Sequence, residues 1–278
     1  MSLCCASCGK AEIDDIKLVP CDDCDLVKYC SDECKEDHKL EHEEECKKRA
    51  AELRDELLFK QPESTHMGDC PICSLPLPLD GSKSGMYLCC SKVICSGCAH
   101  ANRMREDEMR LQHTCPFCRE ALPEAEECDK LLKKRIEAND PVAIFQEGAM
   151  QHNKGDYRKA FSFFAKAAEL GDVEAHYRLA GMYHGGRGVE TDMGKEIQHL
   201  EEAAIGGHPD ARFNLGCNEM RNGNIERAVK HWIISASQGD NYSIKKLFDV
   251  FKEGCMAKDE LTGALRAHQA AVDAMDIS

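Results

Sequence analysis

Paired cysteines in the first half of the chain constrain its fold more than any other feature. Of 19 cysteines in 278 residues, sixteen precede position 119 and fall into two blocks of eight, whereas Cys128, Cys217 and Cys255 stand alone. Cysteines separated by two residues are typical of zinc sites, because this spacing directs both sulfurs toward one ion. The sequence therefore predicts two zinc-binding modules followed by a remainder that contains few cysteines.

The composition limits which cellular compartment and which class of partner molecule we expect. The opening MSLCCASCGK has no apolar stretch of the kind that a signal peptide needs, so we expect a reducing compartment, the cytoplasm or the nucleus. No run approaches the roughly 18 apolar residues of a membrane helix, so no membrane association is expected. The net charge of −14 opposes attraction to nucleic acid. Proteins are therefore the expected partners.

The first cysteine block supplies four pairs of thiolate and imidazole donors, enough for two tetrahedral zinc sites. The expected ligands are Cys5, Cys8, Cys21, Cys24, Cys30, Cys34, His42 and Cys46. His42 and Cys46 are four residues apart and so share one face of a helix. Cys4 and His38 lie close to these positions and are alternative donors.

The spacing from Cys24 onward and the segment YCSDEC resemble the MYND zinc finger. The resemblance implies that alternate pairs share an ion, Cys5 and Cys8 with the pair at 30 and 34, and the pair at 21 and 24 with the pair at 42 and 46. MYND fingers commonly bind short proline-containing peptides. Lys39 replaces the family's Trp and Glu43 its Lys, so the aromatic wall for such a peptide is missing.

The second block again forms four pairs. The expected ligands are Cys70, Cys73, Cys89, Cys90, Cys95, Cys98, Cys115 and Cys118. The spacing resembles a RING finger, which implies one zinc on the pairs at 70 and 73 and at 95 and 98. Lys92 occupies the family's His position and cannot bind zinc while it is protonated. We therefore assign Cys89 to the other zinc, with His100 and His113 as alternatives, and expect about four zinc ions in all.

Three further residues of this block suggest an activity. In ubiquitin-ligase RING fingers, positions similar to Ile72 and Pro116 contact the ubiquitin-conjugating enzyme, and an Arg similar to Arg119 holds the charged thioester in a reactive pose. The resemblance implies a ligase that acts by positioning a conjugating enzyme on a substrate, without catalytic side chains of its own. The alternative is that Ile72 and Pro116 pack locally and that Arg119 is a surface cation.

Helical patterns follow each block. Leu53, Leu57 and Leu58 predict a helix over residues 47–61 that ends before Pro62. A charged amphipathic helix is expected over 122–139, and Asp140 and Pro141 are typical of the start of the next helix.

The remaining chain repeats itself. Small residues that start similar segments stand at Ala143, Ala175, Ala211 and Ser243. Glycines close the segments at Gly171, Gly207 and Gly239. This pattern predicts about four helix–turn–helix repeats with glycine caps, which stack because one pair alone cannot bury its apolar face. The longer second copy carries its extra residues in the turn at 185–192.

The second copy, from AHYRLAGMY at 175 to EEAAIGG at 207, resembles the Sel-type (Sel-one-like) repeat, whose families usually serve as protein-binding scaffolds. We therefore expect small zinc-stabilised α+β fingers followed by an all-α solenoid. The expected boundaries are 1–48 for the MYND-like finger, 49–66 for a helical linker, 67–121 for the RING-like finger, 122–139 for the connecting helix and 140–278 for the repeats. The sequence favours a RING-type ubiquitin ligase whose repeats recruit substrate. The alternative is a noncatalytic zinc-binding adaptor that binds proteins through the MYND-like finger and the repeats.

Overall fold

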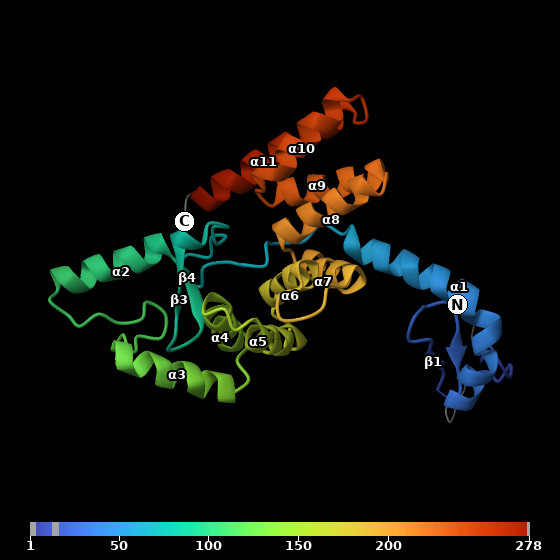
Figure 1. Ribbon diagram of the computed structural model, residues 1–278, viewed down its shortest axis with the longest axis horizontal. Helices are drawn as coiled ribbons and strands as arrows, with labels where there is room; N and C mark the ends of the chain where they lie inside the picture. The colour runs from blue at the N-terminus through green and yellow to red at the C-terminus, as the bar shows by residue number, and fades with distance from the viewer. Residues whose placement is uncertain (1–3, 13–16, 277–278) are drawn as a thin grey trace. The chain divides into compact units, whose positions relative to one another are not determined.

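The computed structural model describes residues 4–12 and 17–276, and the chain forms two compact units, Met1–Lys60 and Gln61–Ser278. Each unit contains one cysteine block, and the second also contains the helical repeats (Figure 1). No helix among the described residues is both long enough and apolar enough to cross a membrane. The predicted fold class, small fingers followed by an all-α solenoid, is confirmed.

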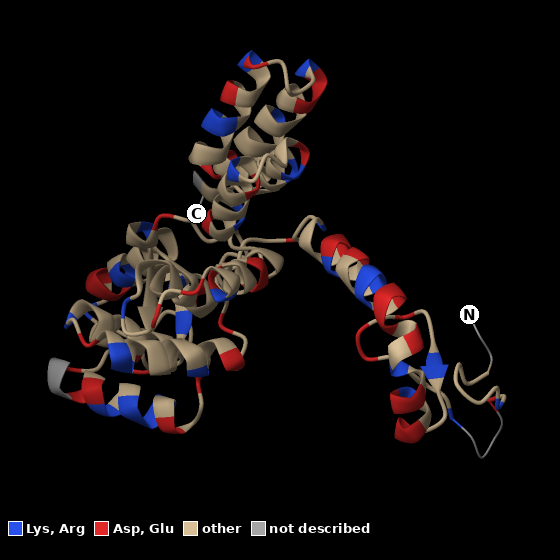
Figure 2. Ribbon diagram, turned by 45° about the vertical axis from the view of Figure 1, so that its right-hand side comes forward, with Lys and Arg blue, Asp and Glu red and all other residues tan. Residues whose placement is uncertain are grey.

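The first unit is a two-stranded antiparallel sheet beside one long helix. Strand β1 (Val19–Pro20) pairs with β2 (Lys28–Tyr29), and α1 runs over Asp32–Leu58. Arg49 of α1 donates from Nε and Nη2 to the Asp25 carboxylate at 2.8 and 3.0 Å, which joins the helix to the loop after β1. Figure 2 shows acidic and basic residues along the whole of α1, as expected for a helix largely in solvent.

Helix α1 begins earlier than the leucine pattern predicts. The expected helix started at residue 47, whereas α1 starts at Asp32. Ser31 caps it by accepting a hydrogen bond from the Cys34 backbone N–H at 3.3 Å, and Asp32 and Glu33 place negative charge in the first turn. The early turns lack an apolar stripe because the buried side of the helix carries metal-type donors instead.

The second unit starts with a small finger of its own. A 3₁₀ turn, η1 (Gly81–Lys83), leads into β3 (Ser84–Tyr87), which pairs antiparallel with β4 (Lys92–Cys95), and α2 follows over Ser96–Glu108. The buried Glu106 carboxylate accepts hydrogen bonds from the backbone N–H and the hydroxyl of Thr114. These bonds attach the segment before Cys115 to α2.

Nine helices complete the second unit over its described residues, 61–276. They are α3 (Ala125–Glu137), α4 (Pro141–Asn153), α5 (Tyr157–Glu169), α6 (Val173–Gly185), α7 (Met193–Ile205), α8 (Pro209–Arg221), α9 (Ile225–Ser237), α10 (Asn241–Lys252) and α11 (Lys258–Asp276). From α4 onward they form consecutive pairs in which each helix packs on the next (Figure 1). Over the described residues, the solenoid therefore contains four helix pairs.

The helix ends follow the sequence signals. Asp140 accepts from the backbone N–H groups of Val142 and Ala143 at the start of α4, and Pro141 takes the first helical position. Gly171, Gly207 and Gly239 have φ values of +88°, +86° and +94°, a conformation that favours glycine. Because of these tight connections, successive pairs stack with their apolar faces in contact.

Clusters of buried apolar residues lie within the described repeats. One surrounds Phe164 and Leu179, and another surrounds Trp232 and Leu247, all of which are at most 1% exposed. Helix α3 connects the first core to the finger, because Arg135 donates to the carbonyl oxygens of residues 88 and 89 and forms an ion pair with the cap of α4.

Candidate metal centres

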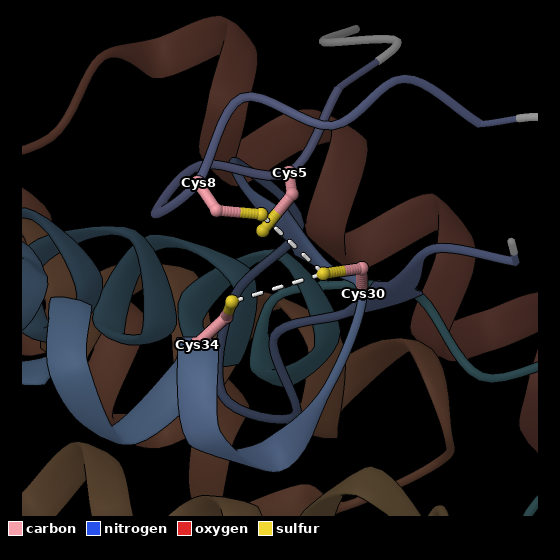
Figure 3. A group of neighbouring side chains, drawn as sticks. All are labelled: Cys5, Cys8, Cys30 and Cys34. Carbon is pink, nitrogen blue, oxygen red and sulfur yellow. Dashed lines mark hydrogen bonds between the residues drawn. The ribbon is translucent and has the colours of Figure 1, made fainter.

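Four sulfurs of the first unit face one another (Figure 3). Cys5 and Cys8 lie in an N-terminal loop, Cys30 follows β2, and Cys34 lies in the first turn of α1. The Cys30 Sγ is 3.5 Å from the Cys8 Sγ and 3.7 Å from the Cys34 Sγ. The structure thus brings together the quartet that the MYND resemblance implies.

A second quartet joins the loop between the strands to α1. Cys21 and Cys24 come from the loop, and His42 and Cys46 project from one face of the helix. The Cys24 Sγ lies 3.2 Å from the His42 Nε2, and the sulfurs of Cys21 and Cys46 are 3.7 Å apart. Because the two quartets alternate along the chain, an ion in each would fix loop, strands and helix together.

The second unit contains two further quartets. Cys70, Cys73, Cys95 and Cys98 form one, and Cys89, Cys90, Cys115 and Cys118 form the other. The sulfur distances are 3.9 Å for Cys73 to Cys95, 3.8 Å for Cys90 to Cys115 and 3.4 Å for Cys118 to Cys89. Their ligands also alternate along the sequence, so this finger is cross-braced like the first.

All four quartets fit zinc. A Zn–S bond of about 2.3 Å in a tetrahedron places two sulfurs about 3.8 Å apart. Six of the sulfur pairs lie between 3.4 and 3.9 Å apart, and the ligand atoms of each quartet all lie within 4.8 Å of one another. Each quartet fills four coordination positions with protein donors, and this closed arrangement is typical of structural zinc.

The burial of the thiols explains why such clusters need a cation. Burial, together with hydrogen bonds to the Cys21 and Cys24 thiols, raises the pKa of Cys46 to about 12. Burial also disfavours the Cys5 thiolate, but backbone N–H groups, led by that of Cys8, lower its pKa to about 6. The Cys5 and Cys46 thiols thus ionise at different pH values. Zinc must displace the proton of every ligand thiol that is still protonated, so zinc binding weakens at low pH.

The structure places Cys89, and not the alternative histidines, in the fourth quartet. The His113 Nε2 instead lies 2.8 Å from the Asp107 carboxylate, and His100 is exposed on α2. The Lys92 ammonium lies 5.9 Å from the centre of the Phe117 ring. In the first unit, His38 bonds to the Tyr29 hydroxyl at 3.1 Å and lies outside both quartets. Cys4 is also outside them and pairs with Ala11 in a β-bridge.

The three residues expected to contact a conjugating enzyme occupy different environments. Ile72 is 44% exposed, whereas Pro116 is buried and its neighbour Phe117 is 43% exposed. Arg119 has a φ of +65° and donates from Nη1 to the Asn102 side-chain oxygen at 2.7 Å. Its guanidinium is therefore engaged within the finger.

A fifth cluster of metal-type donors joins the segment before the second finger to the repeats. The Glu174 Oε2 lies 2.9 Å from the His208 Nε2 and 3.4 Å from the His66 Nε2. The two imidazoles stack with centres 4.1 Å apart and 5° between their planes. The His208 Nδ1 accepts from the Ala211 backbone N–H, so its Nε2 carries the proton donated to Glu174. Glu174 thus contacts both imidazoles, and the cluster fastens the segment before the second finger to the repeats.

The sequence gives no signal for this cluster, because its members come from three separate segments. Although burial favours the neutral acid, hydrogen bonds from His208 and His66 hold the pKa of Glu174 far below its usual range. A backbone bond from the His66 N–H to the Gly207 carbonyl, at 3.0 Å, adds to the attachment.

Asp172, the cap of α6, lies in the same region. Burial and, to a smaller extent, the nearby Glu174 charge raise the pKa of Asp172 from 3.8 to about 6, against the hydrogen bond from the Ala175 backbone N–H. The folded protein therefore holds this proton more tightly than the unfolded chain. The protonated Asp172 carboxyl therefore contributes to the stability of the fold below pH 4, and this contribution is lost as the pH rises to about 6.

Replacing Asp172 by Asn is therefore expected to increase the free energy of unfolding at pH 7.5 by about 1 kcal/mol. The melting temperature measured at this pH should rise accordingly. Asn caps a helix as well as Asp does and has no charge to bury. The gain should shrink at pH 5, where Asp172 is largely protonated. Asp156→Asn on α5 is the matched control, because its bond to Lys159 lowers the pKa of that carboxyl and no gain is expected. A loss of stability at pH 7.5 in Asp172→Asn would contradict the burial argument.

Comparison with family models agrees with these assignments. The MYND finger model matches residues 5–46, which contain the first two quartets. The Sel1 repeat model matches 143–172, 173–208 and 209–240, which contain the pairs α4–α5, α6–α7 and α8–α9. The pair α10–α11 lies beyond these matches. Neither model reaches residues 70–118, so the resemblance to RING fingers rests on cysteine spacing alone.

Similar curated proteins share part of the chain. The DAP3-binding cell death enhancer 1 of Rattus norvegicus is 32% identical over 54% of this chain and 37% of its own length. The Mus musculus protein of that name is 27% identical over 42% of this chain and 31% of its length. Chitin synthase regulatory factor 4 of Schizosaccharomyces pombe is 29% identical over 32% of this chain and 14% of its length. The chain thus spans about a third or less of these relatives.

Solved structures with helical repeats are also similar. A Sel1 repeat protein from Oxalobacter formigenes is 24% identical, with a TM-score of 0.47 over 64% of this chain and 72% of its own. The protective antigen c5321 of uropathogenic Escherichia coli is 19% identical, with a TM-score of 0.42 over 65% and 39% of the two chains. The family matches, taken with the helix pairs and the first two quartets, show that this chain carries a zinc-binding MYND finger and three Sel1 repeats.

Proposed function

We propose that this protein is a noncatalytic adaptor of the cytoplasm or nucleus, in which four structural zinc ions hold the fingers and the helical repeats recruit a partner protein. The observation that carries the proposal is an open groove of about 370 Å³ across the first three repeats. Its lining includes Tyr177 and Gly181 of α6 and Asn214 of α8. A groove of this volume with mixed polar and apolar walls suits a short segment of another protein.

The finger at the N-terminus supports the same assignment of roles. Lys39, which replaces the family's aromatic residue, is 66% exposed and forms an ion pair with Glu36. Without an aromatic wall, this position offers little apolar area to a proline-containing peptide. We therefore assign partner recruitment to the repeats rather than to the MYND finger.

The names of two relatives agree with a role in protein binding, since both are described as binding DAP3. The chain spans about a third of those proteins, so the proposal extends to protein partners in general and not to DAP3 itself.

Panning a library of peptides from disordered protein segments on the full zinc-loaded chain tests this proposal. We expect enriched peptides that compete with one another and that no longer bind Gly181→Trp, in which an indole fills the groove. A Cβ at Gly181 meets nothing within 4 Å, so the side chain has space without strain. Gly263→Trp on α11, where a Cβ also meets nothing, is the matched control. If no peptide that binds saturably is enriched, the proposed adaptor function is wrong.

A RING-type ubiquitin ligase is the second candidate, favoured by the cross-braced second finger and by the exposure of Ile72 and Phe117. Discharge of ubiquitin from a panel of charged conjugating enzymes separates the two functions. The adaptor predicts no discharge, whereas a ligase predicts discharge that Arg119→Ala slows without changing the zinc content.

A further inference from the structure

The groove in the repeats has a charge opposite to that of the chain. Its wall contains three guanidinium groups, those of Arg178 on α6, Arg187 just after α6 and Arg221 at the end of α8. Glu196 is the one carboxylate among the described lining residues, and His184 occupies both its oxygens at 3.0 Å. The groove is therefore positively charged on a chain whose net charge is −14, which indicates a negatively charged ligand.

Two of these arginines are available to a ligand. Arg178 donates to the Glu174 carboxylate at 2.8 Å, so its charge is partly balanced. Within the described part of the chain, neither Arg187 nor Arg221 is paired with a carboxylate, and both are exposed. The Arg221 Nε contacts only the carbonyl oxygen of Cys217, at 3.4 Å. Each can therefore give a forked pair of hydrogen bonds to a carboxylate.

We infer that this groove binds an extended acidic segment of the partner protein, with its carboxylates on Arg187 and Arg221. The inference rests on the proposed function and adds the chemistry of the ligand. Negative charge over the rest of the chain repels an acidic peptide, so electrostatic attraction guides the peptide to the groove alone. The open space above Gly181 leaves room for the peptide backbone between the cations.

Fluorescence anisotropy with the full zinc-loaded chain tests the inference. The probe is a labelled peptide of four Glu-Val-Thr repeats, in which β-branched residues favour an extended backbone. The neutral counterpart carries Gln for Glu. We expect saturable binding of the acidic peptide, at least about tenfold weaker binding of the neutral one, and weakening as NaCl rises from about 50 to about 500 mM.

Charge reversal then locates the site. The double variant Arg187→Glu with Arg221→Glu should weaken binding at least about tenfold. Arg266→Glu, on an exposed position of α11 outside the groove, should change it less than about twofold. Equal binding of both peptides, or equal effects of the double variant and the Arg266→Glu control, would overturn the inference. If Gly181→Trp prevents binding of the panned peptides and these peptides are not acidic, the adaptor function is supported and the inference of an acidic ligand is wrong.

Discussion

Removal of zinc with a strong chelator should unfold both finger modules and leave the helical repeats folded. Structural zinc contributes about 10–16 kcal/mol of apparent binding free energy per site. In the first unit the buried apolar core, apart from the cysteines, is little more than Leu18 and Tyr29. The repeats instead have their own apolar clusters. Trp232 is the single Trp of the chain and is 1% exposed in one of these clusters, so its fluorescence reports on the repeats alone.

On chelation, the emission of Trp232 should stay that of a buried indole while the far-ultraviolet circular dichroism loses the signal of α1 and α2. Substitution of a single buried ligand, Cys24→Ser or Cys115→Ser, should lower the zinc content from about four ions to about three. Cys255→Ser, at an exposed position outside every quartet, is the matched control. A red shift of Trp232 on chelation would mean that the repeats depend on the fingers.

The metal quartets were predictable because their geometry is local. Pairs such as Cys70 and Cys73 fix two sulfurs of a site within one turn of backbone, whatever the rest of the chain does. Which pairs share an ion depends on contacts across the module, and there only the resemblance to MYND and RING fingers provided an assignment. The structure places Cys89 in the fourth quartet together with its neighbour Cys90, as expected.

The repeats were predictable because burial recurs with a fixed period, so that small residues such as Ala175 and Ala211 mark each close approach of helices. The same reasoning failed for the first turns of α1, where metal-type donors replace the apolar stripe. Ser31 followed by Asp32 and Glu33 was the available signal, since it is a typical helix start.

Contacts between distant segments had no signal in the sequence. The hydrogen bonds from Arg135 to the finger, and those of Glu174 with two histidines, depend on how α3 and the segment before residue 70 pack against the repeats. The positive charge of the groove also had no signal in the sequence, because Arg187 and Arg221 are 34 residues apart and line one groove only when the repeats stack.

Two glycines in equivalent helices should respond oppositely to the same substitution. Gly216→Ala on α8 is expected to cost about 2 kcal/mol or more, because its Cβ would lie 2.5 Å from the Nε1 of the buried Trp232. Moving the indole would also break its hydrogen bond to the Phe213 carbonyl oxygen, at 3.2 Å. This loss exceeds the gain of up to about 1 kcal/mol that Ala brings to a helix interior.

Gly181→Ala on α6 is the matched comparison, because a Cβ there meets nothing within 4 Å. Only the helix propensity changes, so this variant should be more stable than the parent by up to about 1 kcal/mol. Urea unfolding followed by circular dichroism measures both variants without relying on Trp232, whose surroundings change in one of them. Equal effects of the two substitutions would show that the solenoid adjusts its helix spacing freely. Opposite effects would mean that close packing of Gly216 on Trp232 fixes the distance between α8 and α9. The position of Arg221 in the groove depends on this distance, because Arg221 lies at the end of α8.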